Sequence, residues 1–170
     1  MIRTRTRSIV ILLSVAALLL GMQSAAVTAK SPKILEFDTM VGVTAGLTGA
    51  QAPIRGINGA GIAWTLATAT GELSTGGHLE IEVTGLVLAA GGNAGSNPSA
   101  TFRGLVSCLD GAGAVVNLLT AAFPATTGPA TSGGGNSKVE ATVALPDPCI
   151  APIVFVMNGG GTSWFATTGG

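Results

Sequence analysis

The sequence predicts an all-β fold, an antiparallel Greek-key β-sandwich of about eight strands. Two observations predict the strands: apolar residues alternate with polar ones in short runs, and glycine-rich segments separate these runs. A third is that no helical period follows the N-terminal apolar segment. The runs recur at spacings near ten residues with long connections, which favours a Greek key over a meander.

Three strands are expected in the first half of the chain. In 35–41, apolar residues oppose Glu36 and Asp38, and in 62–66 a tryptophan alternates with two aliphatic residues. The clearest strand is 78–84, where every second residue is aliphatic and the others are polar. After Gly85 the apolar residues change face, which predicts a bulge there.

The second half adds five expected strands. The apolar runs 102–109 and 114–120 come first, and 138–145 then repeats the clear alternation of small or aliphatic residues with polar ones. The segment 153–157 is apolar on both faces, which is typical of a central strand. The last strand is 164–167.

The N-terminus has the pattern of a secretory signal peptide. Arginines at positions 3, 5 and 7 precede an apolar stretch at 9–20, and small residues follow at 27–29. We therefore expect a signal peptide at 1–29, cleavage between Ala29 and Lys30, and one β-sandwich domain at 30–170. The alternative is an uncleaved anchor at 9–27, although Gln23 and Ser24 interrupt that apolar stretch.

Charge excludes several classes of partner. Charged residues make up 9% of the chain and the formal net charge is +0. Removing 1–29 removes three arginines, which changes the net charge to −3. A charge-poor, weakly acidic domain suits neither nucleic acid nor an anionic membrane. With no later apolar span, the expected location is secreted, extracellular or at the cell surface.

The two cysteines predict a disulfide. Cys108 and Cys149 both follow the signal segment, and an oxidising compartment would join them. The alternative is a metal pair, but two thiolates and one distant histidine are too few ligands for a structural zinc site. No metal and no cofactor are expected.

The residues that hydrolases need are scarce. His78 is the single histidine, so it is the only histidine base available to Ser107 with Asp110, or to Ser163. The run from Gly161 begins like a nucleophile elbow, but Phe165 occupies the place of its second glycine. We therefore do not expect an enzyme.

Paired carboxylates keep a hydrolase as a remote alternative, using Glu80 and Glu82 or His78. Two acids on one strand face can serve glycoside hydrolysis. Glu36 and Asp38 resemble the strand motif of jelly-roll glucanases, but Met40 stands where that family has a third acid.

The tryptophans supply another alternative, a carbohydrate-binding module. An exposed indole can stack on a sugar ring or anchor a partner protein. Trp164 adjoins Phe165, so one of the two faces outward on a strand, whereas Trp64 alternates with aliphatic residues, which favours the core. The ligand-binding candidates are therefore Trp164 and Trp64.

The segments 35–38, 53–56, 146–152 and 164–166 resemble an uncharacterised group of short exported bacterial proteins. The resemblance implies an exported bacterial domain and no activity. The sequence as a whole favours a non-enzymatic cell-surface, matrix or protein-interaction module. Its partner would be a polysaccharide or another surface protein, and pairing of edge strands between chains would give self-association.

Overall fold

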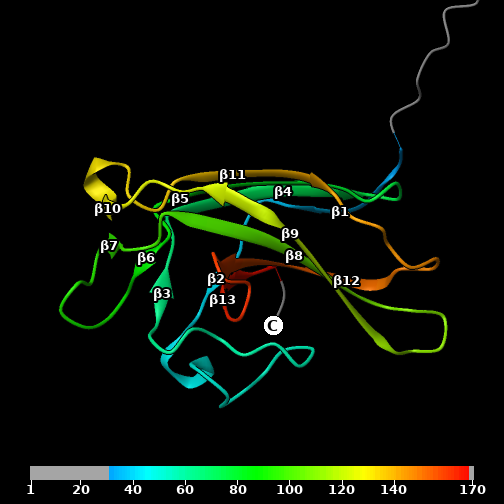
Figure 1. Ribbon diagram of the computed structural model, residues 1–170, viewed down its shortest axis with the longest axis horizontal. Helices are drawn as coiled ribbons and strands as arrows, with labels where there is room; N and C mark the ends of the chain where they lie inside the picture. Colours follow the sequence, from blue (N-terminus) through cyan, green and yellow to red (C-terminus); the bar gives the residue numbers. More distant parts are fainter. Residues whose placement is uncertain (1–30, 169–170) are drawn as a thin grey trace, which may run out of the picture. The chain divides into compact units, whose positions relative to one another are not determined.

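The computed structural model describes residues 31–168. The predicted signal peptide and its cleavage point between Ala29 and Lys30 lie outside these residues. The described chain is all-β, as predicted, and its strands form two main antiparallel sheets that pack together (Figure 1).

The first main sheet has four strands in the order β1-β4-β5-β11. Its strands are β1 (Lys33–Phe37), β4 (Thr68–Ser74), β5 (His78–Thr84) and β11 (Ser137–Thr142). Alternation of side chains buries one face of this sheet and leaves the charged residues on the other. We call it the four-stranded sheet.

The second main sheet has five strands in the order β2-β13-β12-β8-β9. Its strands are β2 (Val41–Gly42), β8 (Thr101–Leu109), β9 (Val115–Pro124), β12 (Ile150–Asn158) and β13 (Trp164–Thr167). The predicted central strand 153–157 is confirmed, because β12 lies between β13 and β8. We call it the five-stranded sheet.

Short elements complete the described chain. Two strand pairs join β3 (Trp64–Thr65) to β6 (Val87–Leu88) and β7 (Ser96–Asn97) to β10 (Gly128–Pro129). The helical elements are two single 3-10 turns, η1 (Ala45–Leu47) and η2 (Ala130–Ser132). Within 31–168, no helix has the length and apolar character needed to cross a membrane.

The main core lies between the two sheets. Leu79, Ile81 and Val83 of β5 are almost completely buried and belong to one cluster with Phe102 of β8. Gly104 of β8 allows this packing, because an added Cβ atom would come within 2.9 Å of the Leu79 side chain. Burial of aliphatic side chains is the dominant favourable term in such a core.

The Greek-key connection is visible in four strands. β8 and β9 form a hairpin, the chain then crosses to β11, and it returns as β12 beside β8. An isolated antiparallel bridge between Ala125 and Ser137 joins the end of β9 to the start of β11, at the side of the sandwich. This is the 4-1-2-3 order of a Greek key.

A third layer covers the outer face of the five-stranded sheet. Residues 43–63, which we call the cover segment, lie along this face in Figure 1. Val43 packs there in a second apolar cluster with Leu105, Phe155, Met157 and Trp164. Both faces of the sheet are therefore buried over most of β8, β12 and β13.

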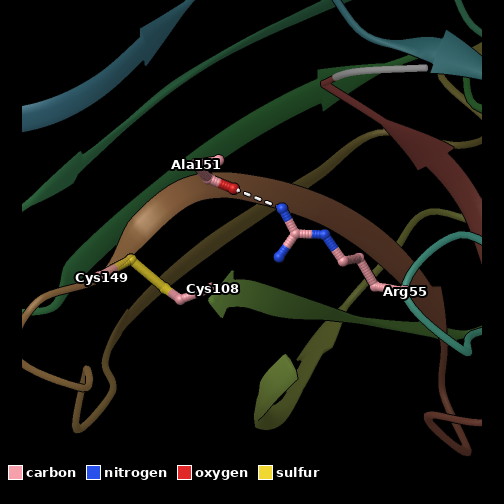
Figure 2. Close-up of a disulfide and its surroundings, with 4 residues drawn as sticks. All are labelled: Arg55, Cys108, Cys149 and Ala151. Atoms are coloured by element: carbon pink, nitrogen blue, oxygen red, sulfur yellow. Dashed lines mark hydrogen bonds between the residues drawn. A yellow bond between two sulfur atoms is a disulfide. The ribbon is translucent and has the colours of Figure 1, made fainter. Parts of the chain in front are cut away.

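The predicted disulfide is confirmed. Cys108 and Cys149 are bonded, with Cα atoms 5.1 Å apart, and they join β8 to the segment entering β12. Figure 2 shows the bond next to Arg55 of the cover segment, whose guanidinium reaches over β12. Since both cysteines are in the disulfide, the alternative of a thiolate metal pair is wrong.

Four details of the strand prediction were wrong. The change of face after Gly85 is not a bulge, because β5 ends at Thr84 and Gly85 turns the chain with a φ of 61°. The expected strand 62–66 shrinks to β3, and Val41 is exposed. A whole strand, β4, was not predicted; Gly71 interrupts its pattern.

Candidate functional site

Four glutamates form one row across the outer face of the four-stranded sheet. Glu36 of β1 is opposite Glu72 of β4, Glu72 is opposite Glu80 of β5, and Glu80 is opposite Glu140 of β11. We call these four residues the acidic row. Since neighbouring strands are ~4.8 Å apart, the row extends over about 14 Å. Like charges directly opposite one another oppose sheet pairing.

A groove of about 670 Å³ runs over this face. Asp38 and Glu82 add two carboxylates to its lining, beside three members of the acidic row. Phe37 packs against Gly71, its cross-strand partner, and an added Cβ on Gly71 would collide with the Phe37 ring. The groove therefore presents a line of negative charge, whereas the Phe37 ring packs against the main core.

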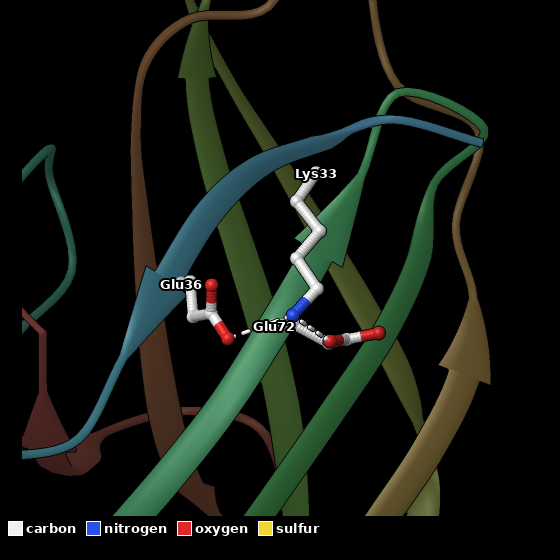
Figure 3. A network of polar contacts seen from close by, with 3 residues as sticks. All are labelled: Lys33, Glu36 and Glu72. Carbon is white, nitrogen blue, oxygen red and sulfur yellow. Dashed lines mark hydrogen bonds and ion pairs between the residues drawn. The ribbon is translucent and has the colours of Figure 1, made fainter. Parts of the chain in front are cut away.

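Two lysines hold the acidic row together. Lys33 Nζ lies 2.7 Å from both Glu36 and Glu72, as Figure 3 shows. Lys138 Nζ lies 2.8 Å from Glu80 and 3.4 Å from Glu140. The hydrogen bonds to Glu36 and then Glu72 raise the pKa of Lys33, and those to Glu80 and then Glu140 do the same to the pKa of Lys138. Each ammonium group thus sits between two carboxylates of the row.

The row is a line of charge and not a cation cage. Among residues 31–168, no group of three or more His, Cys, Asp or Glu side chains is placed to hold a metal ion. The side chain of Glu72 is 16% exposed and that of Glu80 is 36% exposed, whereas Glu36 and Glu140 at the ends are more open. The arrangement fits an extended cationic partner better than a point ion.

The tryptophan candidates are buried. Trp64 is 6% exposed and stacks on Phe165 with ring centroids 3.8 Å apart, and Trp164 is 0% exposed in the cluster beneath the cover segment. The expectation that one of Trp164 and Phe165 faces outward was wrong, because the cover segment buries the outer face of β13. Neither indole has an exposed face for a sugar ring, which removes the premise of the carbohydrate-binding alternative.

The hydrolase candidates are dispersed. His78 lies on the outer face of the four-stranded sheet, whereas Ser107 is completely buried on the far face of the five-stranded sheet, beside the second cluster. Asp110 caps a turn, since its carboxylate accepts hydrogen bonds from the amides of Ala112 and Ala114. Glu80 and Glu82 are the candidates that the structure brings together, in the groove.

The sequence patterns place the acidic residues of β1, β5 and β11 on the polar faces of their strands, but they do not show that these residues form one row across the sheet. The missing piece is Glu72, which belongs to the strand that was not predicted. The sequence does contain a sign of this strand, because the polar residues Thr68, Thr70 and Glu72 alternate with the small residues between them. No family model, no curated protein and no solved structure matches this chain.

Proposed function

We propose that the chain is an exported, non-enzymatic β-sandwich that acts as an interaction module. In this proposal, the groove over the acidic row binds a lysine- or arginine-rich segment of another surface protein. The observation that carries it is the in-register alignment of Glu36, Glu72, Glu80 and Glu140, the first three of which line the groove. The confirmed disulfide supports an oxidising location.

The chemistry of the groove favours a cationic chain. A partner in extended conformation places successive side chains on one face ~6.8 Å apart, so three such side chains span about the 14 Å of the acidic row. Guanidinium groups bind carboxylates in bidentate geometry. Lys33 and Lys138 preorganise the row, and a ligand cation would compete with them for the same oxygens.

Peptide binding tests this function. The purified protein is titrated with an arginine-rich peptide and with a glutamine-substituted peptide of equal length, at low and at high salt. We expect the arginine peptide alone to bind, with affinity that falls as salt rises. Glu82→Gln changes an exposed groove carboxylate and should weaken binding several-fold, whereas Asp147→Asn removes the same charge outside the groove. Equal effects of the two variants, or binding of the glutamine peptide, would overturn the proposal.

Export is tested separately. The protein is expressed as residues 1–170 in a bacterial host and recovered from the envelope and the medium. We expect the exported form to begin at Lys30, as read by N-terminal sequencing. A full-length product retained in the inner membrane supports the uncleaved anchor instead.

One observation favours a second candidate, the small hydrolase. Glu80 and Glu82, the pair named for it, both line the groove. Assays against a panel of polysaccharides distinguish the two functions. Turnover that disappears in a folded Glu80→Gln variant would support the hydrolase, and its absence in the wild type would leave the interaction module.

A further inference from the structure

The longest strand of the described chain lies at a sheet edge. β9 has ten residues, contains no charged residue, and pairs only with β8 in the five-stranded sheet. Along an edge strand, every second residue directs its N–H and C=O groups away from the sheet. Between 31 and 168, no strand of this chain continues the sheet beyond β9.

The side chains of β9 are also unlike those of a protected edge. Val115 is 47% exposed and Leu119 is 41% exposed, although both are aliphatic. The edge strands of the four-stranded sheet carry lysines and glutamates, which is the usual protection against pairing between chains. The protective features of β9 itself are Pro124 at its end and a bulge near Arg103 that bends the ladder between β8 and β9.

We propose that β9 pairs with β9 of a second copy of this chain. Two copies related by a twofold axis near Leu119 would pair antiparallel and bring Val115 close to the far end of the partner's strand. Because β9 is uncharged, this pairing desolvates no charge and opposes no like charges, unlike pairing through β1 or β11. Residues 115–122 are the part of β9 open to this pairing, because β9 adjoins β11 at its Pro124 end, and the two five-stranded sheets would continue into one another.

The uncharged, aliphatic character of β9 also favours a second copy of this chain as the partner strand. A charged segment would leave its charges unpaired beside an uncharged strand, whereas a second copy supplies an identical aliphatic edge. The acidic row lies on the other sheet, so this inference goes beyond the proposed function. The dimer and the peptide-binding groove can therefore fail independently.

Sedimentation and light scattering test the pairing across a concentration series that reaches the millimolar range. We expect a monomer–dimer equilibrium whose dissociation constant rises at least tenfold in Leu119→Lys and in Val115→Lys. Ile62→Lys is the matched control, since Ile62 is an equally exposed aliphatic residue outside the main sheets. It should dimerise like the wild type.

Hydrogen exchange locates the interface. Amides of 115–122 should exchange more slowly at concentrations where the dimer forms, while those of β1 should not change. A wild type that stays monomeric throughout the series overturns the proposal. So does a dimer that both folded lysine variants retain with an unchanged dissociation constant.

Discussion

Arg55 of the cover segment donates a hydrogen bond from Nη2 to the main-chain oxygen of Ala151 in β12, at 2.9 Å (Figure 2). Both residues have positive φ angles, 51° and 46°, and they are the two non-glycine residues among 31–168 that do. Backbone in this region costs a residue with a Cβ roughly 1–2 kcal/mol. The main-chain oxygen of Arg55 also accepts a hydrogen bond from Asn117 of β9. One residue thus fastens the cover segment to two strands.

Replacing Arg55 should loosen this fastening. Arg55→Met keeps most of the side-chain stem but removes the charged donor, and we expect the free energy of unfolding to fall by about 1–2 kcal/mol. Limited proteolysis should then cut within 43–63 faster than in the wild type. An unchanged cleavage rate and an unchanged urea midpoint would show that the second cluster alone holds the segment.

The disulfide should account for a large share of the stability. Cys108 and Cys149 are 41 residues apart in sequence, and a loop of that size corresponds to about 4 kcal/mol in the chain-entropy model. We expect the double variant Cys108→Ala, Cys149→Ala to lose this amount in urea unfolding. The wild type under reducing conditions is the control and should behave similarly. A loss well below 2 kcal/mol would mean that the reduced chain keeps residual structure around these strands.

Gly104 should not tolerate a side chain. An added Cβ would also come within 3.2 Å of Val139 from the opposite sheet, so Gly104→Ala overpacks the core. Such overpacking costs about 1–3 kcal/mol. Gly92→Ala is the matched control, because nothing lies within 4 Å of its Cβ position. The two variants are compared by thermal unfolding, and equal melting temperatures would contradict the tight approach of the sheets.

Both tryptophans should be protected from solvent. Because Trp64 and Trp164 are buried, we expect blue-shifted fluorescence and weak quenching by acrylamide. Trp64→Phe and Trp164→Phe assign the two signals. Ready quenching of Trp164 would mean that the cover segment opens in solution, and it would restore a surface indole as a binding candidate.

The two lysines that bind the acidic row should make the free energy of unfolding depend on pH in the alkaline range. Since the folded-state pKa of Lys138 is raised above its ordinary 10.5 by Glu80 and then Glu140, its contribution is complete below 10.5. It is lost as the pH rises through the raised value. We expect the urea midpoint to fall above pH 10.5, and to fall less steeply in Lys138→Met. Identical slopes would show that this ion pair does not stabilise the sheet.

The strands with regular alternation were predictable, and the surface they form was not. The pattern of 78–84 placed Leu79 and Glu80 on the correct faces, because period-two alternation directly reports burial. Gly71 hid β4, since a glycine within a strand carries no pattern and its role is to receive the Phe37 ring. The glutamates align only because of the order and register of the strands in the sheet. No local sequence pattern encodes that order and register, and β4 itself was not predicted.

The burial of Trp164 was equally beyond local pattern. A strand covered on both faces needs a second layer, and here that layer is an irregular segment whose apolar residues follow no period. Its prediction required knowledge of where the cover segment folds back. The disulfide, in contrast, followed from counting, because two cysteines allow a single intramolecular pairing.

The uneven placement of charge gives the sandwich an electric dipole perpendicular to its sheets. Among residues 31–168, the face of the acidic row and its groove holds six carboxylates and two lysines, a balance of −4. The remaining four charges, two arginines and two aspartates, cancel. The field of a cationic surface would therefore exert a torque on the approaching sandwich. This torque would turn the face of the acidic row toward that surface. Orientation would be selected before contact, at distances set by the ionic strength.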